Sequence, residues 1–332
     1  MAWKSVLKAD PTEWLLEPVD PSVRFWALQD LEDKGPDHPE VQEAQDALMA
    51  SAPVRAILEA QQTEGHWVHR EDMYLPKYRA TTHSLLILAE LGAKRTLAVE
   101  RGLEHVFEFQ RDSGHFLTQL PKTAKGKASV VKDGCCLDAN VLYYMAHFGY
   151  LEDPRVVRLL DFIVDYHSME EAGWKCRAFP IDPDSVFPVN CYMGAAKTLR
   201  ALSMIPPRRR SPEIEAIIER EVENVLENGI YRYLRNPDGT RKDKAGWMRF
   251  GFPLFYQSDA LEVLETLTRL GVKDDRTDDA LRLVLDAQGD DGSWPLKHTF
   301  NGKMWADIDV KHQPSKWITL RAMRTLRRYY SE

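Results

Sequence analysis

The sequence predicts an all-α protein built from repeated helical hairpins, and three observations support this fold class. Alternating strand patterns are scarce, whereas segments with apolar residues at helical spacing recur along the chain. Glycine or proline follows most of these segments, as expected where a helix stops. A spacing of Gln-x-x-x-Gly-x-aromatic also returns three times, which indicates an internal repeat.

Six segments are expected to form the first helix of successive hairpins. In Thr81–Leu91, for example, leucines recur near helical spacing and Gly92 supplies the stop. A hairpin cannot bury its apolar face alone, so copies of about 55 residues are expected to stack against one another. The predicted first helices begin near residues 22, 81, 137, 192, 258 and 315.

Short turns precede two of the second helices and look alike. They span Glu152–Arg155 and Lys273–Arg276, and each contains an Asp that can accept hydrogen bonds from the free amides of the new helix. We therefore interpret the acidic residues of these turns as helix caps.

The most specific signal lies at the end of the second helices. Glycine permits the left-handed turn that ends a helix, and the aromatic residue two positions later can fold back onto that helix. The glutamine side chain can bind freed backbone groups near the next helix. The three matching copies are Gln61–Trp67, Gln110–Phe116 and Gln288–Trp294.

Composition excludes several classes of protein. The 332 residues include 44 Lys and Arg against 51 Asp and Glu, a net charge of −7, so no excess of positive charge favours nucleic-acid binding. No apolar stretch approaches the roughly 20 residues that span a bilayer, and the first residues are charged where a signal peptide is apolar. We expect a cytoplasmic protein, whose four cysteines are too few for a disulfide scaffold. The sequence does not indicate an oligomeric state.

The copy from Arg101 to Phe116 resembles the QW repeat of squalene cyclases and of protein prenyltransferase beta subunits. The resemblance extends from about residue 22 to residue 329. It implies a single (α/α)6 toroid over residues 1–332, with inner helices around a central cavity, outer helices as a belt and residues 1–20 as a closing segment.

The same resemblance implies a terpenoid cyclase-like or prenyltransferase-like enzyme. Its ligand would be an apolar small molecule of isoprenoid type, bound in the central cavity. The alternative is a noncatalytic toroid scaffold that binds a ligand or a partner, because a fold does not determine a function.

Cysteines gather in the loops that lead into the inner helices. Because the third and fourth inner helices are neighbours in a ring, these thiols are expected to converge, and zinc is the metal that such a set would hold. Asp133-Gly134-Cys135 also resembles the Asp-x-Cys zinc pair of prenyltransferase beta subunits. The alternative is that the cysteines pack as small apolar residues. The candidate ligands are Asp133, Cys135, Cys136, Cys176 and Cys191.

A possible catalytic acid precedes the last inner helix. Asp307-Ile308-Asp309-Val310 resembles the D-x-D-D motif of squalene cyclases, in which the middle Asp protonates an alkene, but it departs from the motif at the last position. Asp309 is thus the candidate acid, with Asp307 and His312 as candidate catalytic neighbours. The alternative is that Asp309 caps the last helix.

Aromatic residues near the fifth and sixth inner helices are candidates for the cavity wall. Aromatic faces can enclose an apolar ligand or stabilise a carbocation, although they are also common in an ordinary core. The segment His298–His312 is long enough to form a lid. The candidate cavity aromatics are Trp247, Phe252, Tyr256, Trp305 and Trp317.

Overall fold

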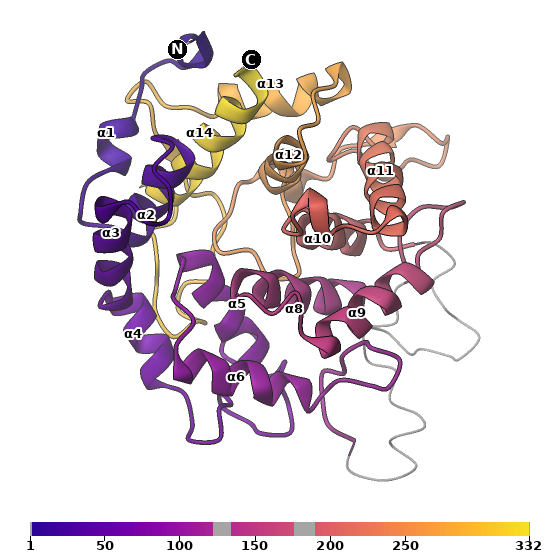
Figure 1. The fold of residues 1–332 in the computed structure, drawn as a ribbon. Coiled ribbons are helices and arrows are strands. Elements are labelled where there is room, and N and C mark those ends of the chain that lie inside the picture. The colour runs from indigo at the N-terminus through magenta and orange to yellow at the C-terminus, as the bar shows by residue number, and fades with distance from the viewer. Residues whose placement is uncertain (1, 122–133, 176–189, 332) are drawn as a thin grey trace.

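The helices of the protein form a closed double ring, as Figure 1 shows. The computed structural model describes residues 2–121, 134–175 and 190–331. Within these residues, six helices make the inner ring, and the predicted fold class, an all-α (α/α)6 toroid, is confirmed. The inner helices are α2 (Pro21–Asp30), α5 (Thr81–Leu91), α8 (Cys135–His147), α10 (Tyr192–Leu202), α12 (Ala260–Arg269) and α14 (Lys316–Tyr330).

The outer helices differ from the inner ones in how much of their surface is buried. α9 buries one apolar stripe that includes Val156, Leu159 and Ile163, whereas in α5 every residue except Glu90 is buried. Because α5 is covered on both sides, its sequence is apolar nearly all round. The outer helices are α3 (Pro39–Met49), α4 (Ala52–Glu59), α6 (Leu97–Phe107), α9 (Pro154–Asp165), α11 (Pro212–Glu227) and α13 (Asp278–Asp286).

Short elements occupy the loops. Strand β3 (Trp294–Pro295) pairs antiparallel with β4 (Pro314–Ser315), so the two ends of the long loop between them are held together. The other short elements are β1 (Leu234–Arg235), which pairs with β2 (Arg241–Lys242), and the 3₁₀ helices η1 (Ala2–Val6), η2 (Pro207–Arg209), η3 (Ala245–Met248) and η4 (Asp275–Thr277).

The ring closes where the two ends of the chain meet. The first residues, η1 and α1 (Thr12–Leu15), contact the last helix, α14. Lys8 donates from its backbone N to Oε1 of Gln288 at 2.8 Å and from Nζ to the Gln288 carbonyl at 2.6 Å. On the inner ring, α2 contacts α14, and Trp26 of α2 donates to the Glu90 carbonyl of α5 at 2.9 Å. The N-terminal segment therefore stands beside the last hairpin as the next outer element.

One glutamine in each complete copy of the repeat joins a hairpin to the next outer element. Its Nε2 donates both to the carbonyl of the glycine four residues later and to a carbonyl at the start of the next outer segment. Bond lengths of 2.7 to 2.9 Å repeat in all three copies. The pairs of acceptors are Gly65 and Ala98 for Gln61, Gly114 and Arg155 for Gln110, and Gly292 and Ala9 for Gln288.

The tryptophans of the repeat fold back onto the helix that they follow. Trp67 donates from Nε1 to the Ile57 carbonyl of α4, and Trp294 donates to the Val284 carbonyl of α13, both at 2.7 Å. Trp174, in an incomplete copy, makes the same contact with the Ile163 carbonyl of α9 at 2.8 Å. These contacts satisfy carbonyls at helix ends that would otherwise lack a partner.

The capping turns repeat as well. Asp153 accepts a hydrogen bond from the Arg155 backbone N, and Asp274 accepts one from that of Arg276, both at 2.8 Å. In each turn the arginine also reaches a glutamate of the preceding outer helix. One aspartate of each turn is therefore a cap, as the sequence predicts: Asp153 caps α9, and Asp274 caps the 3₁₀ helix η4 that leads into α13.

Gly114 is expected to tolerate alanine much less well than Gly149. Both have positive φ, +101° and +81°, but only at Gly114 would a Cβ meet backbone, 2.1 Å from the Arg158 carbonyl oxygen. Gly149→Ala should reduce the free energy of unfolding by about 1 to 2 kcal/mol through backbone strain. Gly114→Ala should lose at least about 3 kcal/mol, because overpacking adds to the strain. Urea unfolding measures both, and equal losses would contradict the close approach.

Candidate functional site

A pocket lies at the N-terminal ends of two neighbouring inner helices, α5 and α8. It is small and partly open to solvent, with a cavity volume of about 10 Å³, which is room for about one water molecule. The first turns of these helices supply most of its wall, and the loops before α5 and α12 supply one tyrosine each. None of the lining residues is Lys, Arg, Asp or Glu. They are Tyr74, Thr82, His83, Leu86, Cys136, Leu137, Asn140 and Tyr256.

His83 is the most deeply buried titratable group of the pocket. The residue is 3% exposed, and its ring lies 4.8 Å from the ring of Tyr74, 5.2 Å from Phe255 and 5.8 Å from Tyr78, measured between centroids. Burial, with a smaller effect from the charge of Lys77, lowers the pKa of His83 to about 3. The imidazole is therefore neutral near pH 7, and its Nδ1 has no hydrogen-bond partner in the described part of the chain.

Lys77 lies beside the two tyrosines of the pocket. The Lys77 ammonium lies 4.8 Å from the ring centroid of Tyr256 and 5.8 Å from that of Tyr74, which are cation–π distances. Lys77 also donates to the Tyr256 hydroxyl at 3.5 Å. Burial raises the pKa of Tyr74 far above its usual value, so this phenol stays protonated. The pocket thus presents neutral, aromatic and weakly polar groups to a ligand.

Only part of the proposed zinc site lies within the described residues, since Asp133 and Cys176 fall outside them. Cys136 lines the pocket. Cys135 and Cys191 converge instead on Gly194 of α10, where the position of a Cβ would be 2.0 Å from one sulfur and 3.5 Å from the other.

Cys191 also has a structural role, because its sulfur accepts a hydrogen bond from the Gly194 backbone N at 3.3 Å and so caps α10. Among the described residues, no group of three or more His, Cys, Asp and Glu side chains is placed to hold a metal ion.

Asp309, the candidate acid, contacts the start of α14. Its Oδ2 accepts from the Ser315 hydroxyl at 2.6 Å and its Oδ1 from the Val310 backbone N at 3.1 Å. Ser315 in turn caps α14. Burial raises the pKa of Asp309 despite these hydrogen bonds. Asp20, which caps α2, also has a raised pKa, through burial and through the nearby charge of Asp309.

The two candidate neighbours of Asp309 lie at the surface. Asp307 is exposed and accepts a hydrogen bond from the Gly302 backbone N at 2.7 Å. His312 is exposed, with a positive φ of 66°. Neither of them, nor Asp309, is among the residues that line the pocket.

The candidate cavity aromatics are divided among four places. Tyr256 lines the pocket. Phe252 and Trp317 stack on each other with 4.1 Å between ring centroids and 7° between ring planes. Trp247 packs against Tyr192 and Tyr233, whose rings also stack on each other. Trp305 belongs to the long loop between β3 and β4.

That loop, residues 296–313, reaches across the ring to the start of α5. Trp305 donates from Nε1 to the Arg79 carbonyl at 3.0 Å and to the Ser84 hydroxyl at 3.1 Å. Arg79 donates back to the Met304 carbonyl at 3.1 Å, and Phe300 stacks on Tyr78 at 4.2 Å. The predicted lid segment therefore covers residues that immediately precede or begin α5, next to the pocket.

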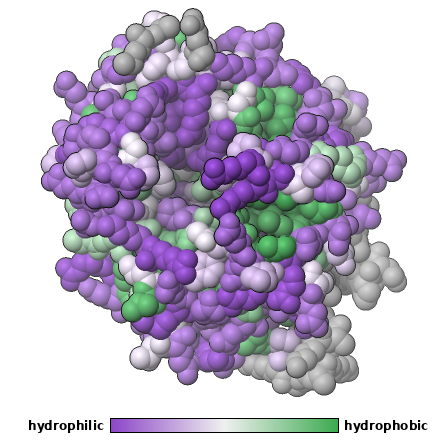
Figure 2. Space-filling model, in the orientation of Figure 1, coloured by the Kyte–Doolittle hydropathy of each residue, from purple (hydrophilic) through white to green (hydrophobic). Residues whose placement is uncertain are grey.

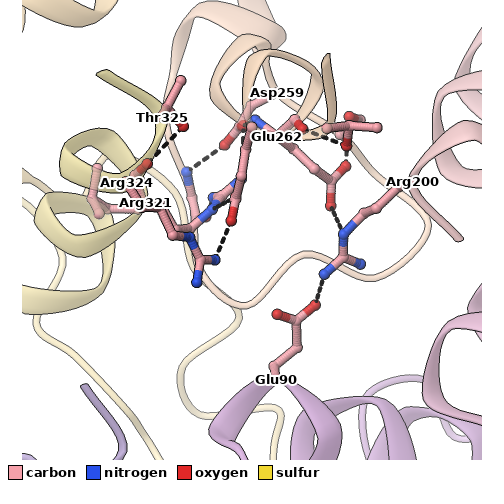
Figure 3. A network of polar contacts seen from close by, with 12 residues as sticks. Glu90, Arg200, Asp259, Glu262, Arg321, Arg324 and Thr325 are labelled. Carbon is pink, nitrogen blue, oxygen red and sulfur yellow. Dashed lines mark hydrogen bonds and ion pairs between the residues drawn. The ribbon is translucent and has the colours of Figure 1, made fainter. Parts of the chain in front are cut away.

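A buried network of charges on the inner helices was not predicted from the sequence (Figure 3). Lys197 of α10 is 1% exposed, and its Nζ donates to Oε1 of Glu262 on α12 at 2.7 Å. The Ser258 hydroxyl donates to the other oxygen of Glu262 at 2.6 Å. Arg200 pairs with Glu262 at 3.5 Å and with Glu90 of α5.

The network continues from α12 to α14 and α2. Arg321 donates from Nε to Glu265 at 3.0 Å, from Nη1 to the Gly251 carbonyl at 2.9 Å and from Nη2 to Asp259 at 3.5 Å. Arg324 pairs with Glu265 and, at 3.2 Å, with Asp30 of α2.

Burial alone would raise the pKa of Glu265, but the charges of Arg324 and Arg321 outweigh it and hold that pKa well below its usual range. The face of the molecule in Figure 2 is mainly hydrophilic, with hydrophobic side chains in a few separate patches.

Among the described helices, none combines the length and the apolar character that crossing a membrane requires.

No protein-family model matches the sequence, and no curated protein matches it. Solved structures similar to this chain include a variant of the type II terpene cyclase MstE from Scytonema in complex with its substrate, geranylgeranyl dihydroxybenzoate. It is 15% identical, with a TM-score of 0.48, over 95% of this chain and 87% of that one. A protein from Actinoplanes is 14% identical, with a TM-score of 0.45, over 93% of this chain and 89% of that one. These similarities say nothing about the substrate of this chain.

His83 is expected to make the protein less stable in mild acid. Its pKa is about 3 in the folded state against 6.5 for an ordinary histidine, so the unfolded chain takes up this proton first as the pH falls. The contribution of neutral His83 to stability is then fully present above about pH 6.5 and is lost as the pH falls toward 3. Between pH 7 and pH 5, His83→Phe should lose about 2 kcal/mol less of its unfolding free energy than the parent protein.

Urea unfolding at the two pH values measures this difference. His312→Asn, which replaces an exposed histidine, should show the same loss as the parent. If His83→Phe lost as much unfolding free energy between pH 7 and pH 5 as the parent, His83 would be protonated in the folded protein at pH 5.

Proposed function

We propose that this chain is a terpenoid cyclase-type enzyme that binds an apolar isoprenoid substrate in the pocket at the ends of α5 and α8. The observation that carries the proposal is the composition of the pocket wall, which has aromatic, aliphatic and neutral polar side chains and no formal charge. Such a wall suits an apolar ligand and fits the usual make-up of small-molecule sites.

The aromatic faces suit the chemistry as well as the ligand. In a cyclisation of this type, an acid transfers its proton to one alkene carbon, and the π electrons form the new C–H bond. The other carbon becomes a cation, which a second alkene attacks to close a ring. The rings of Tyr74 and Tyr256 would stabilise that cation through their negative faces. A neighbouring C–H then gives its proton to a base, and neutral His83 is the base that the pocket offers.

Asp309 is the acid in this proposal. Burial raises the pKa of its carboxyl, which favours the protonated form that an acid requires. It belongs to the same loop as Trp305, which contacts the start of α5 beside the pocket. Movement of this loop would bring the acid and the pocket to one substrate.

The test uses a length series of linear isoprenoids, namely geraniol, farnesol and geranylgeraniol, with cyclised products detected by gas chromatography and mass spectrometry. Asp309→Asn should lower turnover at least about 100-fold, because general acid catalysis supplies that much. Asp307→Asn, an exposed carboxyl in the same loop, is the matched control and should retain turnover. Leu137→Trp, which fills the pocket, should abolish binding.

Each negative result has a distinct meaning. Full activity in Asp309→Asn would remove the acid role and leave Asp309 as a structural group that holds the helix cap Ser315. Binding that depends on Leu137 without any product would favour the noncatalytic scaffold. No binding of any member of the series would reject the isoprenoid substrate.

A zinc site is the second candidate, and the convergence of Cys135 and Cys191 on Gly194 favours it. Cys176 and Asp133 would complete a tetrahedral set, and Cys136 would face the substrate from the pocket. Zinc would supply an activated thiolate or a polarised oxygen at the cavity rim.

Metal analysis of protein purified without chelator should find one zinc per chain. Cys135→Ser and Cys191→Ser should each lose the metal. Cys136→Ser should retain it, because this thiol lines the pocket rather than the Gly194 contact. Metal-free parent protein, or loss of zinc only in Cys136→Ser, would contradict this site.

A further inference from the structure

Three arginines of the buried network keep an N–H group without an acceptor. In the described part of the chain, Arg200 Nη1, Arg324 Nε and Arg328 Nη1 are buried and have no hydrogen-bond partner. Arg200 and Arg324 are each 9% exposed. A buried donor without an acceptor is unfavourable, and more so when it is charged. Arg321 in the same network differs, since all its guanidinium nitrogens have acceptors.

The unsatisfied groups come from α10 and α14, the two inner helices that flank α12. In Figure 3, Arg200 of α10 lies on one side of the α12 residue Glu262, and Arg324 of α14 lies on the other. The Arg200 guanidinium lies 3.8 Å from the ring centroid of Tyr143, which covers one face. Its Nη2 pairs with Glu90, and Nη1 is the nitrogen that has no acceptor among the described residues. Arg328 pairs through Nη2 with Asp30 at 3.2 Å, and its Nη1 has no acceptor among the described residues.

The charges around this space favour an anion. In their usual ionisation states, the cations of the network outnumber the carboxylates by one. Burial lowers the pKa of Arg328 to about 10, and the charges of Arg269 and Arg324 act in the same direction. The cations are Lys197, Arg200, Arg269, Arg321, Arg324 and Arg328, and the carboxylates are Asp30, Glu90, Asp259, Glu262 and Glu265.

We propose that the ring interior between α10 and α14 binds an oxyanion, a carboxylate or a phosphate, through Arg200, Arg324 and Arg328. The several oxygens of such a group can accept from all three guanidinium groups at once, and charge-assisted hydrogen bonds of this kind are strong. This inference does not depend on the isoprenoid substrate or on zinc, because it uses residues outside the pocket.

The oxyanion can come from two sources, a free small anion or the head group of an amphipathic ligand. The pocket and the arginines share the walls of the ring interior, because Leu86 of the pocket and Glu90 of the network are one helical turn apart on α5. Asn140 and Tyr143 have the same relation on α8. An acyl chain in the pocket would therefore point an acidic head group toward Arg200.

Titration calorimetry of the full chain tests the site with inorganic phosphate, acetate and dodecyl phosphate. Saturable binding of phosphate or acetate identifies a free anion as the ligand. Dodecyl phosphate that binds at least about tenfold more tightly than both inorganic phosphate and dodecanol identifies a head group. In either case, Arg200→Lys, which keeps the charge but lacks Nη1, should weaken binding at least about tenfold.

Arg328→Gln provides a second variant at a partly exposed position, in case Arg200→Lys does not fold. It should also weaken binding at least about tenfold. Arg327→Gln is the matched control, because its guanidinium contacts the Asp30 carbonyl at 2.5 Å and Asp33 rather than the space between α10 and α14. It should bind within about twofold of the parent.

Two results overturn the proposal. One is the absence of saturable binding of any of the three anions. The other is binding that Arg200→Lys and Arg328→Gln leave unchanged, which would locate the anion elsewhere, such as at the run Arg208–Arg210 on the turn after α10.

Discussion

Ring closure depends on one side-chain amide, the glutamine that ends each complete hairpin. By donating to its own glycine carbonyl and to a carbonyl of the next outer element, it fixes the angle between successive hairpins. Around the ring these angles must sum to a closed circle, and the contact of Gln288 with Ala9 meets that condition. The pocket follows from this geometry, because closure brings the N-terminal ends of α5 and α8 together at the same side of the ring.

Local chemistry made the helices predictable. Gly92, for example, stops α5 at the residue that the sequence indicates, and the glutamine spacing correctly implied contacts with the next helix. The long loops were less predictable, because no periodic pattern describes their path. Nothing in the sequence indicates that His83 and Tyr74 lie side by side in one pocket.

The charged network shows why the sequence does not reveal which charged residues are buried: their burial depends on contacts with helices that are distant along the chain. Arg321 is 4% exposed and Arg327 is a surface ion-pairing residue, yet both lie on α14 among similar neighbours. A run of charges on a helix ordinarily indicates a solvated face. Only the ring places Arg321 and Arg324 opposite acids of α12 and α2. The interior is therefore divided along its axis, with neutral aromatic groups at the N-terminal ends of α5 and α8 and ion pairs one helical turn deeper.

The contact between Lys8 and Gln288 has a consequence for how the protein unfolds. An open array of repeats has two end repeats, each held by one neighbour, and such ends fray before the middle. Here the first segment covers the last hairpin, so each hairpin has neighbours on both sides, and the two chain ends lie near each other in Figure 1. Opening any hairpin requires breaking two interfaces, which favours cooperative unfolding of the whole ring and makes its N-terminal residues as essential as any in the middle.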